Sequence, residues 1–377
     1  MVALTGLLPA SMNESPQLRA LRTEVREFLD EEFATGAIAP SIDCWMTGWD
    51  DAFSRRLADR GWLGITTPTE YGGRGGTFLE RFVVTEELLA AGAPVAAHWI
   101  ADRQIGPSLL KFGTDEQKQR FLPEIAAGRC FFGIGMSEPD SGSDLASVST
   151  RAERTDGGWL ITGAKVWTTW AHRSDYFIAL VRTEPRDETR RHAGLSQFIV
   201  DLKADGVDIR PIVSMGGHHH FNEVFLDQVF VPDEMVFGQI GDGWHQVTSE
   251  LAFERSGPER FLSPFPLYAA LLDHAADTDL AVGRSAARFF ALHQLSLGIA
   301  GALQRGDAVD TSAALYKVIG TLNEGEVVDQ AALLADPSAN ELIEKVNGGL
   351  LQRPGFTLRG GTVEVLTGVV ARGLGLR

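Results

Sequence analysis

Residues 131–170 read FFGIGMSEPDSGSDLASVSTRAERTDGGWLITGAKVWTTW, and this stretch decides how the rest of the chain is interpreted. It begins with a short apolar run that breaks into hydroxyl, acidic and glycine residues at positions 137–144. Its second half has a hairpin pattern, because Asp156, Gly157 and Gly158 separate two runs that read as β-strands. Small hydroxyl and glycine residues beside tryptophans suit a flat ligand that is both polar and aromatic. The stretch therefore predicts a β domain that carries a ligand-binding face.

The apolar pattern changes twice along the chain. Apolar residues recur at helical spacing before residue 129, short β-type runs fill residues 129–235, and helical spacing returns to the C-terminus. The expected helices include residues 94–111 and 258–275. The sequence thus predicts an α+β fold, mainly α, with a β-barrel or β-sandwich in the middle. The predicted domains are an N-terminal helical domain at 1–128, a central β domain at 129–235 and a C-terminal four-helix bundle at 236–377.

Composition excludes several classes of partner. The net charge of −16 argues against binding to nucleic acid or to an anionic membrane surface. Two cysteines cannot form a disulfide framework, and reduced thiols in a cytosol are the simplest interpretation. The N-terminus has no signal-peptide pattern, and no stretch approaches the ~18 apolar residues of a membrane span. We therefore expect a soluble, cytoplasmic protein.

Two local patterns invite functions that their context does not support. The glycine-rich loop at residues 72–76 lacks the Lys-Ser/Thr ending and the preceding strand of a phosphate loop, and no Gly-x-Gly-x-x-Gly follows a strand. His218, His219 and His220 are adjacent, so in an extended chain their side chains point to opposite faces. No cysteine or carboxylate stands near them at ligand spacing. The sequence predicts a glycine-rich turn and no metal site.

Six motifs, in order and spacing, resemble those of the acyl-CoA dehydrogenase family over nearly the whole chain. They are MSEPDSGSD at 136–144, ITGAKVWTT at 161–169, FNEVFLDQVFVP at 221–232, GDGW at 241–244, GGTVEV at 360–365 and ARGLGL at 371–376. The resemblance implies the three-domain fold described above and FAD as the cofactor. It also implies α,β-dehydrogenation of an acyl-CoA thioester, with electrons passed to an electron-transferring flavoprotein.

The resemblance also assigns site residues. On the matching positions, the isoalloxazine ring of FAD would be lined by Ile134, Met136, Ser137, Trp167 and Thr169. Ser137 and Thr169 would supply hydrogen bonds to the polar edge of the ring. Ser143 would face the pantetheine of CoA. A turn and a core tryptophan in a β domain are the alternative interpretation of the same residues.

The implied chemistry needs a carboxylate that removes the α-proton of the thioester while the flavin takes the β-hydride. Members of the family place this base at one of two positions. One precedes the Gly-Thr of the C-terminal motif, and here that residue is Gly360, which cannot act as a base. The other is eleven residues after the glycine that opens the first C-terminal helix, and eleven residues after Gly243 stands Glu254. The resemblance therefore implies that Glu254 is the catalytic base.

Helical geometry supports Glu254 independently. This residue lies three positions after Leu251 and seven after Val247, so it shares their apolar helix face. A proline at position 258 cannot donate to the carbonyl of Glu254, so the helix should kink there. The alternatives are a surface glutamate paired with an arginine, or Glu250 as the base. Arg255, the next residue, is predicted to contact the substrate.

Two family elements that hold FAD are missing. The Arg-x-x-Phe-Gly motif, whose arginine reaches the FAD of a neighbouring subunit, is absent from residues 277–284. The Gln-x-x-Gly-Gly element is replaced at residues 329–339. Arg284 or Arg288 is one possible substitute. A second subunit is the other, and the chain resembles the base-bearing subunit of two-subunit acyl-CoA dehydrogenases of sterol side-chain catabolism.

Other functions remain open at this point. The same fold serves acyl-CoA oxidases and flavin monooxygenases, and a chain without the missing elements can act as a structural subunit that binds little FAD. Retention of Glu254 favours a dehydrogenase over a monooxygenase. Phe261, Phe265 and Tyr268 either line a pocket or form core at helical spacing, and we expect core. Acyl specificity does not follow from the sequence.

Overall fold

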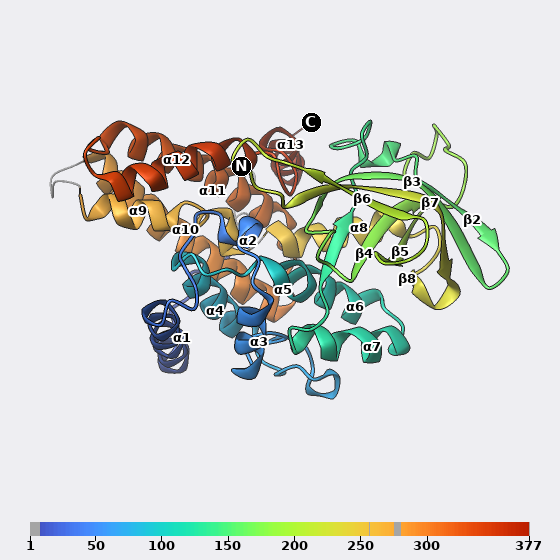
Figure 1. Cartoon of the computed structure of the whole chain (residues 1–377), viewed down its shortest axis with the longest axis horizontal. Helices are drawn as coiled ribbons and strands as arrows, with labels where there is room; N and C mark the ends of the chain where they lie inside the picture. Colours follow the sequence, from blue (N-terminus) through green and yellow to red (C-terminus); the bar gives the residue numbers. More distant parts are fainter. Residues whose placement is uncertain (1–7, 256, 275–279, 377) are drawn as a thin grey trace. The chain divides into compact units, whose positions relative to one another are not determined.

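The computed structural model describes residues 8–255, 257–274 and 280–376, without the side chains of residues 250–254. Its elements run from helices through strands to helices (Figure 1). This order confirms the predicted fold class, with N-terminal helices, a central β-sheet and C-terminal helices. Within these residues, no helix has both the length and the apolar character that a membrane crossing requires.

The chain folds into two compact units, and each unit combines segments that are far apart in the sequence. Unit 1 contains Met1–Trp49, Gly76–Ala96 and Ala252–Arg377. Unit 2 contains Asp50–Gly75 and Ala97–Leu251, which include the whole β-sheet. The division into domains at residues 128 and 235 stays a prediction.

The N-terminal helices begin and end where local sequence signals place them. In α1 (Pro16–Ala34), the Ser15 side chain accepts a hydrogen bond from the backbone N–H of Leu18 at 3.2 Å, and proline occupies the first helical position. One apolar stripe of α1 is buried, as its spacing predicted. The other N-terminal helices are α2 (Cys44–Thr47), α3 (Asp51–Asp59), α4 (Phe78–Ala90), α5 (Ala96–Ile100), α6 (Gly106–Phe112) and α7 (Asp115–Ala126).

The helix expected at residues 94–111 is interrupted in the structure. It consists of α5, a π-helical segment at Ala101–Ile105 and α6. Pro107 stands just after this segment and has no N–H to donate to a carbonyl of the preceding turn. A wider turn accommodates the missing bond, which explains why the π-segment precedes the proline.

The middle of the chain forms one eight-stranded sheet, with the strand order β6-β7-β3-β2-β4-β5-β8 and β1 paired with β4. β1 is parallel to β4, and the long strands β3 and β7 are antiparallel. The bounds are β1 (Phe132–Gly135), β2 (Arg151–Thr155), β3 (Gly158–Thr169), β4 (Tyr176–Arg182), β5 (Leu195–Asp201), β6 (Val207–Ile212), β7 (Phe221–Pro232) and β8 (Val236–Phe237).

The core of unit 2 lies between the sheet and the helices α6 and α7 (Figure 1). Phe121 of α7 packs edge-on against Phe132 of β1, with ring centroids 5.5 Å apart, and Phe177 and Phe198 are fully buried in the same cluster. β4 is buried along almost its whole length, as is typical of a strand covered on both faces. This buried centre supports β1 and β3, which carry the predicted ligand face.

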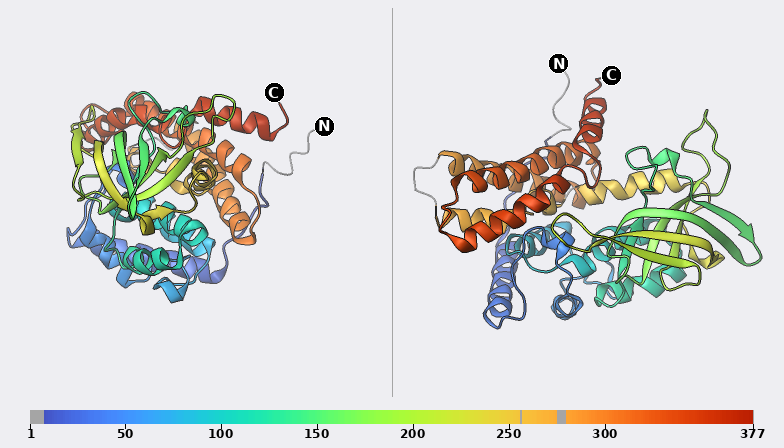
Figure 2. Two further views of the ribbon diagram at one scale, coloured as in Figure 1. Left: turned by 90° about the vertical axis from the view of Figure 1, so that its right-hand side faces the viewer. Right: turned by 45° about the horizontal axis from the view of Figure 1, so that its top comes forward.

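The C-terminal helices of unit 1 pack around α11, which contacts α9, α10, α12 and α13 (Figure 2). Their bounds are α9 (Phe265–Leu272), α10 (Leu280–Arg305), α11 (Asp310–Leu334), α12 (Asn340–Phe356) and α13 (Val363–Gly373). The single helix expected at residues 258–275 was wrong in part. A short 3₁₀ turn, Pro258–Arg260, comes first, and α9 begins only at Phe265, because Pro264 and Pro266 suit the first turn of a helix and not its interior.

Candidate functional site

The ligand face predicted from the sequence is centred on an irregularity in β3. The pairing of β3 with β7 shifts register between Lys165 and Thr168, which produces a β-bulge. Trp167 lies in this bulge with φ +62°, a left-handed conformation that is unfavourable for a residue with a side chain. Its side chain is 55% exposed and packs edge-on against Phe221, with ring centroids 5.6 Å apart. A large aromatic ring is therefore held outward on a strained backbone, a combination that marks functional sites.

The segment after β1 lies directly beside this bulge. The carbonyl of Ser137 accepts a hydrogen bond from the backbone N–H of Val166 at 2.9 Å, and the carbonyl of Met136 accepts one from Lys165 Nζ at 3.2 Å. Ser137 and Thr169 are half-buried, and within the described residues their hydroxyl groups make no hydrogen bond. The structure thus places an exposed aromatic ring and these two hydroxyl groups on neighbouring segments.

Ile134 and two glycines complete this edge. Ile134 is half-buried on β1, opposite Ile178 of β4. On one side of it, a β-carbon on Gly133 would approach the Thr169 carbonyl to 3.4 Å, and on the other a β-carbon on Gly135 would reach the Phe177 ring at 2.3 Å. At Gly135 only glycine permits this close approach of β1 to its neighbours, whereas the contact at Gly133 is close to an ordinary van der Waals separation. The apolar, aromatic and hydroxyl groups of this edge fit the flat ring system of a flavin.

A buried ion pair that the sequence analysis missed fixes the two segments to each other. Lys165 Nζ lies 2.8 Å from Glu138 Oε1, and both side chains are almost fully buried. Burial lowers the pKa of Lys165 to about 8, and the charge of Glu138 opposes that fall. Burial would raise the pKa of Glu138, but the charge and hydrogen bonds of Lys165 outweigh it and lower that pKa to about 2. Both groups are therefore ionised at neutral pH.

The carboxylate of Glu138 also organises the loop that follows. It accepts hydrogen bonds from the backbone N–H groups of Ser149 at 2.6 Å and Thr150 at 2.9 Å. Ser143, the predicted pantetheine contact, is exposed in the loop closed by these bonds. The next residue, Asp144, forms an ion pair with Arg191 at 2.6 Å. Ser143 is thus presented on a loop fixed at both ends.

The predicted base and its neighbour lie at the end of α8 (Gly243–Arg255). Glu254 is in the last turn of this helix, and its side chain and that of Glu250 lie outside the described residues. Instead of the kink expected at Pro258, α8 ends at Arg255, and Pro258 opens the 3₁₀ turn Pro258–Arg260. Arg255 is half-buried, and its Nη2 lies 3.5 Å from the position that a β-carbon on Gly361 would occupy. Arg255 thus lies beside the C-terminal glycine motif of unit 1.

The C-terminal motif forms a left-handed turn. Gly360 has φ +66° and Gly361 has φ +88°. The buried Lys317 donates a hydrogen bond from Nζ to the carbonyl of Gly361 at 2.5 Å. Both glycines adopt a conformation that other residues rarely accept, so the turn itself requires them.

A buried polar network is centred on Arg359, the residue that precedes this turn. It links three parts of unit 1. Arg359 donates to Asp43 Oδ2 at 2.5 Å and to Ser263 Oγ at 3.0 Å, and its guanidinium lies 4.4 Å from the ring centroid of Trp45. Glu324 of α11 accepts a hydrogen bond from the backbone N–H of Ser263 at 3.0 Å. Burial raises the pKa of Glu324 to about 7, although the charge of Arg359 lowers it. Two buried carboxyl groups thus depend on the guanidinium of Arg359.

A cavity of about 620 Å³ lies in unit 1 between α1, α4, α10 and the start of α9. Phe261 and Phe265 line it together with Phe289, while Tyr268 is buried beside Phe289, with ring centroids 4.8 Å apart. The expectation that the three aromatic residues are core therefore holds for Tyr268, whereas Phe261 and Phe265 also face a cavity.

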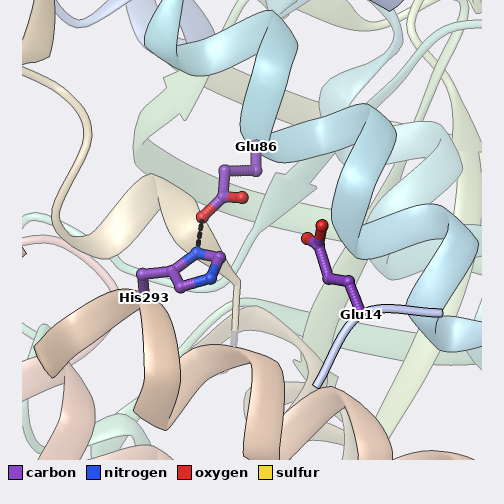
Figure 3. Close-up of side chains that lie close together, drawn as sticks. All are labelled: Glu14, Glu86 and His293. Atoms are coloured by element: carbon purple, nitrogen blue, oxygen red, sulfur yellow. Dashed lines mark hydrogen bonds and ion pairs between the residues drawn. The ribbon is translucent and has the colours of Figure 1, made fainter. Parts of the chain in front are cut away.

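Charged side chains are among the residues that line this cavity, and three of them, Glu14, Glu86 and His293, lie close together (Figure 3). Within the described part of the chain, Glu14, Glu86 and His293 form the group whose ligand atoms lie close enough to hold a metal ion, within 4.8 Å of one another. His293 Nδ1 is 2.6 Å from Glu86, and hydrogen bonding to Glu86 raises the pKa of His293. Arg22 pairs with both Glu14 and Glu86, so a guanidinium already occupies the space between the two carboxylates and partly compensates their charge. Glu14, Glu86, His293 and Arg22 therefore form an ion-pair cluster.

The two arginines considered as substitutes for the missing FAD contacts differ in their surroundings. Arg284 is exposed on α10. Arg288, one turn further along, forms an ion pair with Glu326 of α11. The charge of Arg288 is therefore already compensated within unit 1.

The chain thus combines a helix–sheet–helix element order with an exposed aromatic ring in a β-bulge and with two hydroxyl groups on neighbouring segments that make no hydrogen bond within the described residues. Comparison with known proteins specifies the family. The model of the acyl-CoA dehydrogenase N-terminal domain matches residues 15–129, and that of the middle domain matches residues 133–229. Acyl-CoA dehydrogenase FadE29 of Mycobacterium tuberculosis is 32% identical over 384 residues, which cover 95% of this chain and 96% of that protein. The chain belongs to the acyl-CoA dehydrogenase family.

Solved structures agree with this assignment. The structure described as the Tcur3481-Tcur3483 steroid ACAD superposes with a TM-score of 0.84 at 29% identity, over 97% of this chain and 99% of the other. The ChsE4-ChsE5 complex from Mycobacterium tuberculosis superposes with a TM-score of 0.79 at 28% identity, over 98% of this chain and 100% of the other. These two matches confirm the predicted similarity to two-subunit steroid acyl-CoA dehydrogenases.

The more identical curated relatives match over shorter segments. Three mycobacterial acyl-CoA dehydrogenases are 44%, 44% and 37% identical, and the matched segments cover 27%, 52% and 64% of their lengths. The chain thus spans about half the length, or less, of the two most identical of these relatives. Membership of an enzyme family is shown.

Proposed function

We propose that this protein catalyses the FAD-dependent α,β-dehydrogenation of an acyl-CoA thioester, as the base-bearing subunit of a two-subunit enzyme. The observation that carries the proposal is the edge formed by Trp167, Thr169 and Ser137. An exposed ring lies there on neighbouring segments with two hydroxyl groups that make no hydrogen bond among the described residues. FAD, when bound, supplies the acceptor for the β-hydride. Ile134 and Met136 contribute the apolar part of the same edge, so the residues present fit this cofactor.

The residues of this chain have distinct roles in the proposed reaction. Trp167 covers the ring system, and Ser137 and Thr169 hydrogen-bond to its polar edge. Ser143, on its fixed loop, contacts the pantetheine of CoA. Glu254 takes the α-proton of the thioester onto its carboxylate, and Arg255 contacts the substrate near the C-terminal glycine motif. The loss of the α-proton and the β-hydride leaves an α,β-double bond in the product.

A partner subunit and an electron acceptor complete the proposal. The family elements that reach the FAD of a neighbouring subunit are missing from the sequence, and two of the similar solved structures are named for pairs of proteins. We therefore assign the missing FAD contacts to a second acyl-CoA dehydrogenase-like subunit. Electrons pass to an electron-transferring flavoprotein, and the reaction is placed in the cytoplasm. By the same similarity, steroid-type acyl chains are the substrates to test first.

Substitution of the predicted base tests the mechanism. We expect Glu254→Gln to retain FAD and to lose at least about a hundredfold in the rate of dehydrogenation, because a positioned general base contributes roughly 10²–10⁴-fold. The measurement is bleaching of bound flavin on anaerobic addition of straight, branched and steroidal CoA esters, followed by ferricenium reduction without oxygen consumption.

Glu250→Gln is the matched control, because it removes a carboxylate from the same helix one turn earlier. This variant should bleach flavin at the rate of the natural protein. Near-normal turnover of Glu254→Gln, with loss of turnover in Glu250→Gln, would transfer the role of base to Glu250. Oxygen consumption in place of dye reduction would indicate an oxidase.

A further inference from the structure

The strained segment of β3 is held from one side by a polar cluster that the proposed reaction does not use. Asn222 of β7 is fully buried, and its Nδ2 donates a hydrogen bond to the carbonyl of Thr168 at 3.1 Å. Its Oδ1 lies 3.1 Å from His172 Nδ1 and 2.8 Å from His219 Nε2. All four groups come from β3, β7 and the two segments that adjoin them. One amide therefore connects two histidines to the residue that follows Trp167.

The hydrogen bonds fix the protonation of the two histidines. An amide oxygen only accepts, so His172 must carry a proton on Nδ1 and His219 must carry one on Nε2. The two rings are stacked, with centroids 4.0 Å apart and 14° between their planes, an arrangement that two positive charges would oppose. Burial, and then the proximity of His219, lower the pKa of His172. Both rings therefore donate to the amide oxygen, and they orient the amide so that its nitrogen faces Thr168.

The backbone near this amide needs such support. Trp167 and Trp170 both have positive φ, at +62° and +54°, a strained conformation that persists only where the surroundings enforce it. The backbone N–H of Trp170 donates to the carbonyl of His220 at 2.7 Å, which holds the end of the segment. The side chain of Asn222 holds the middle of the segment through its hydrogen bond to the carbonyl of Thr168. Without the amide, the Thr168 carbonyl would lose this hydrogen bond, and the bulge would be free to relax.

We propose that Asn222 is a positioning residue for flavin binding, and that His172 and His219 orient its amide so that Trp167 and Thr169 keep the conformation that accepts the isoalloxazine ring. This inference rests on the flavin face proposed above. It adds three residues that touch neither the cofactor nor the substrate. They act through the backbone of residues 167–169.

The test compares variants that keep the hydrogen bonds of the Asn222 amide with variants that lose one of them. Asn222→Asp keeps the shape and the acceptor but removes the donor to Thr168. His219→Ala removes a donor to Asn222, whereas His219→Gln restores a donor at the position of Nε2. His218→Ala is the control, because His218 is exposed and makes no hydrogen bond to Asn222 among the described contacts. Each variant is made in the full chain and is studied with the partner subunit if the natural protein requires it to bind FAD.

The readouts are the dissociation constant for FAD, from quenching of its fluorescence, and the visible absorption band of the bound flavin. Asn222→Asp and His219→Ala should bind FAD roughly tenfold more weakly, since loss of one hydrogen bond is worth up to about 1.4 kcal/mol. Both should also shift the flavin band. His219→Gln and His218→Ala should retain natural affinity and spectrum. Far-UV circular dichroism establishes folding, and if Asn222→Asp does not fold, the His219 pair carries the test.

The outcomes separate this inference from the proposed function. If Trp167→Ala weakens FAD binding while Asn222→Asp and His219→Ala do not, the flavin face stands and the positioning role is overturned. If Trp167→Ala and Thr169→Ala also leave FAD affinity unchanged, or the natural protein binds no FAD even with its partner, both proposals fail. A loss of affinity in His219→Gln equal to that in His219→Ala would also overturn the positioning role.

Discussion

At the scale of single residues, Glu324 is the clearest example of a group whose charge is determined by its surroundings. It is fully buried, and with Asp43 it depends on the guanidinium of Arg359. With the pKa raised to about 7, the folded chain holds a proton on Glu324 that the unfolded chain, with the ordinary value of 4.5, has already released. The stability contributed by this proton is full below pH 4.5 and is lost as the pH rises through 7.

Glu324→Gln should therefore raise the free energy of unfolding at pH 8 by up to about 3 kcal/mol, since one pKa unit corresponds to about 1.4 kcal/mol. At pH 4.5 the variant and the natural protein should be similar, because glutamine resembles protonated glutamate and keeps the acceptor for Ser263. Thermal or urea unfolding at the two pH values measures the difference. Glu326→Gln, an exposed change on the same helix, is the control. Equal stability of Glu324→Gln and the natural protein at pH 8 would contradict the raised pKa.

At the scale of elements, the Lys165–Glu138 pair joins β3 to the loop that follows β1. Lys165 also donates to the carbonyls of Met136 and Leu180, at 3.2 Å and 2.6 Å. Removing one partner of a buried pair leaves the other charge without compensation. The pair thus determines the position of the segment that carries Met136 and Ser137.

Glu138→Gln should lower the free energy of unfolding by about 3–5 kcal/mol, as expected for a buried cation that loses its partner. The double variant Glu138→Gln/Lys165→Met removes both charges and should recover part of this loss. Glu153→Gln, which removes an exposed carboxylate from β2, should change little. Urea titrations measure all four proteins. A Glu138→Gln protein as stable as the natural one would show that the pair contributes no net stability.

The pair also has a pH signature in the natural protein. The pKa of Glu138 is lowered to about 2 from an ordinary value of 4.5, so its contribution to stability is full above pH 4.5. That contribution disappears as the pH falls from 4.5 toward 2. Acid unfolding in this range should therefore be shallower in the double variant.

The helices and strands also show which parts of the fold could be predicted from the sequence. The spacing of apolar residues predicted α1, and the hairpin signal predicted β2 and β3, because both patterns are local. The helix expected at 258–275 failed at Pro264, since the helical propensity of its neighbours was outweighed by a residue that favours the start of a helix over its interior. The pairing of Lys165 with Glu138 was missed although both residues stand in quoted motifs. A lysine in an otherwise buried strand was the available signal, because such a charge requires a partner.

At the scale of the whole molecule, the two units combine distant parts of the chain. Asp43, Ser263 and Arg359 meet in one network, although 316 positions separate the first from the last. Local patterns do not encode such contacts, so neither this network nor the Asn222 cluster followed from the sequence. The resemblance supplied the positions of Trp167 and Thr169, and the structure supplied their strained backbone. Glu254 remains a prediction, because its side chain lies outside the described residues.

The proposed partner belongs to this scale. Purified alone, the chain should contain much less than one FAD per subunit, because the elements that hold the far end of the cofactor are missing. Co-expression with an acyl-CoA dehydrogenase-like partner should bring FAD content close to one per site and restore activity. Flavin absorbance relative to protein concentration, with the mass of the complex, measures this result. A fully loaded and active homo-oligomer would refute the two-subunit proposal.

The left-handed turn at Gly360 limits how the position of the proposed base could change during evolution. In the family, one of the two positions used for the base corresponds to Gly360, and here the backbone has φ +66°. A glutamate installed by substitution would bring a β-carbon into a conformation that L-residues adopt only at a cost of roughly 1–2 kcal/mol. Moving the base from the helix to this turn would therefore require the backbone to change before, or together with, the side chain. For the proposed base Glu254, a transfer from α8 to position 360 would thus take more than one substitution.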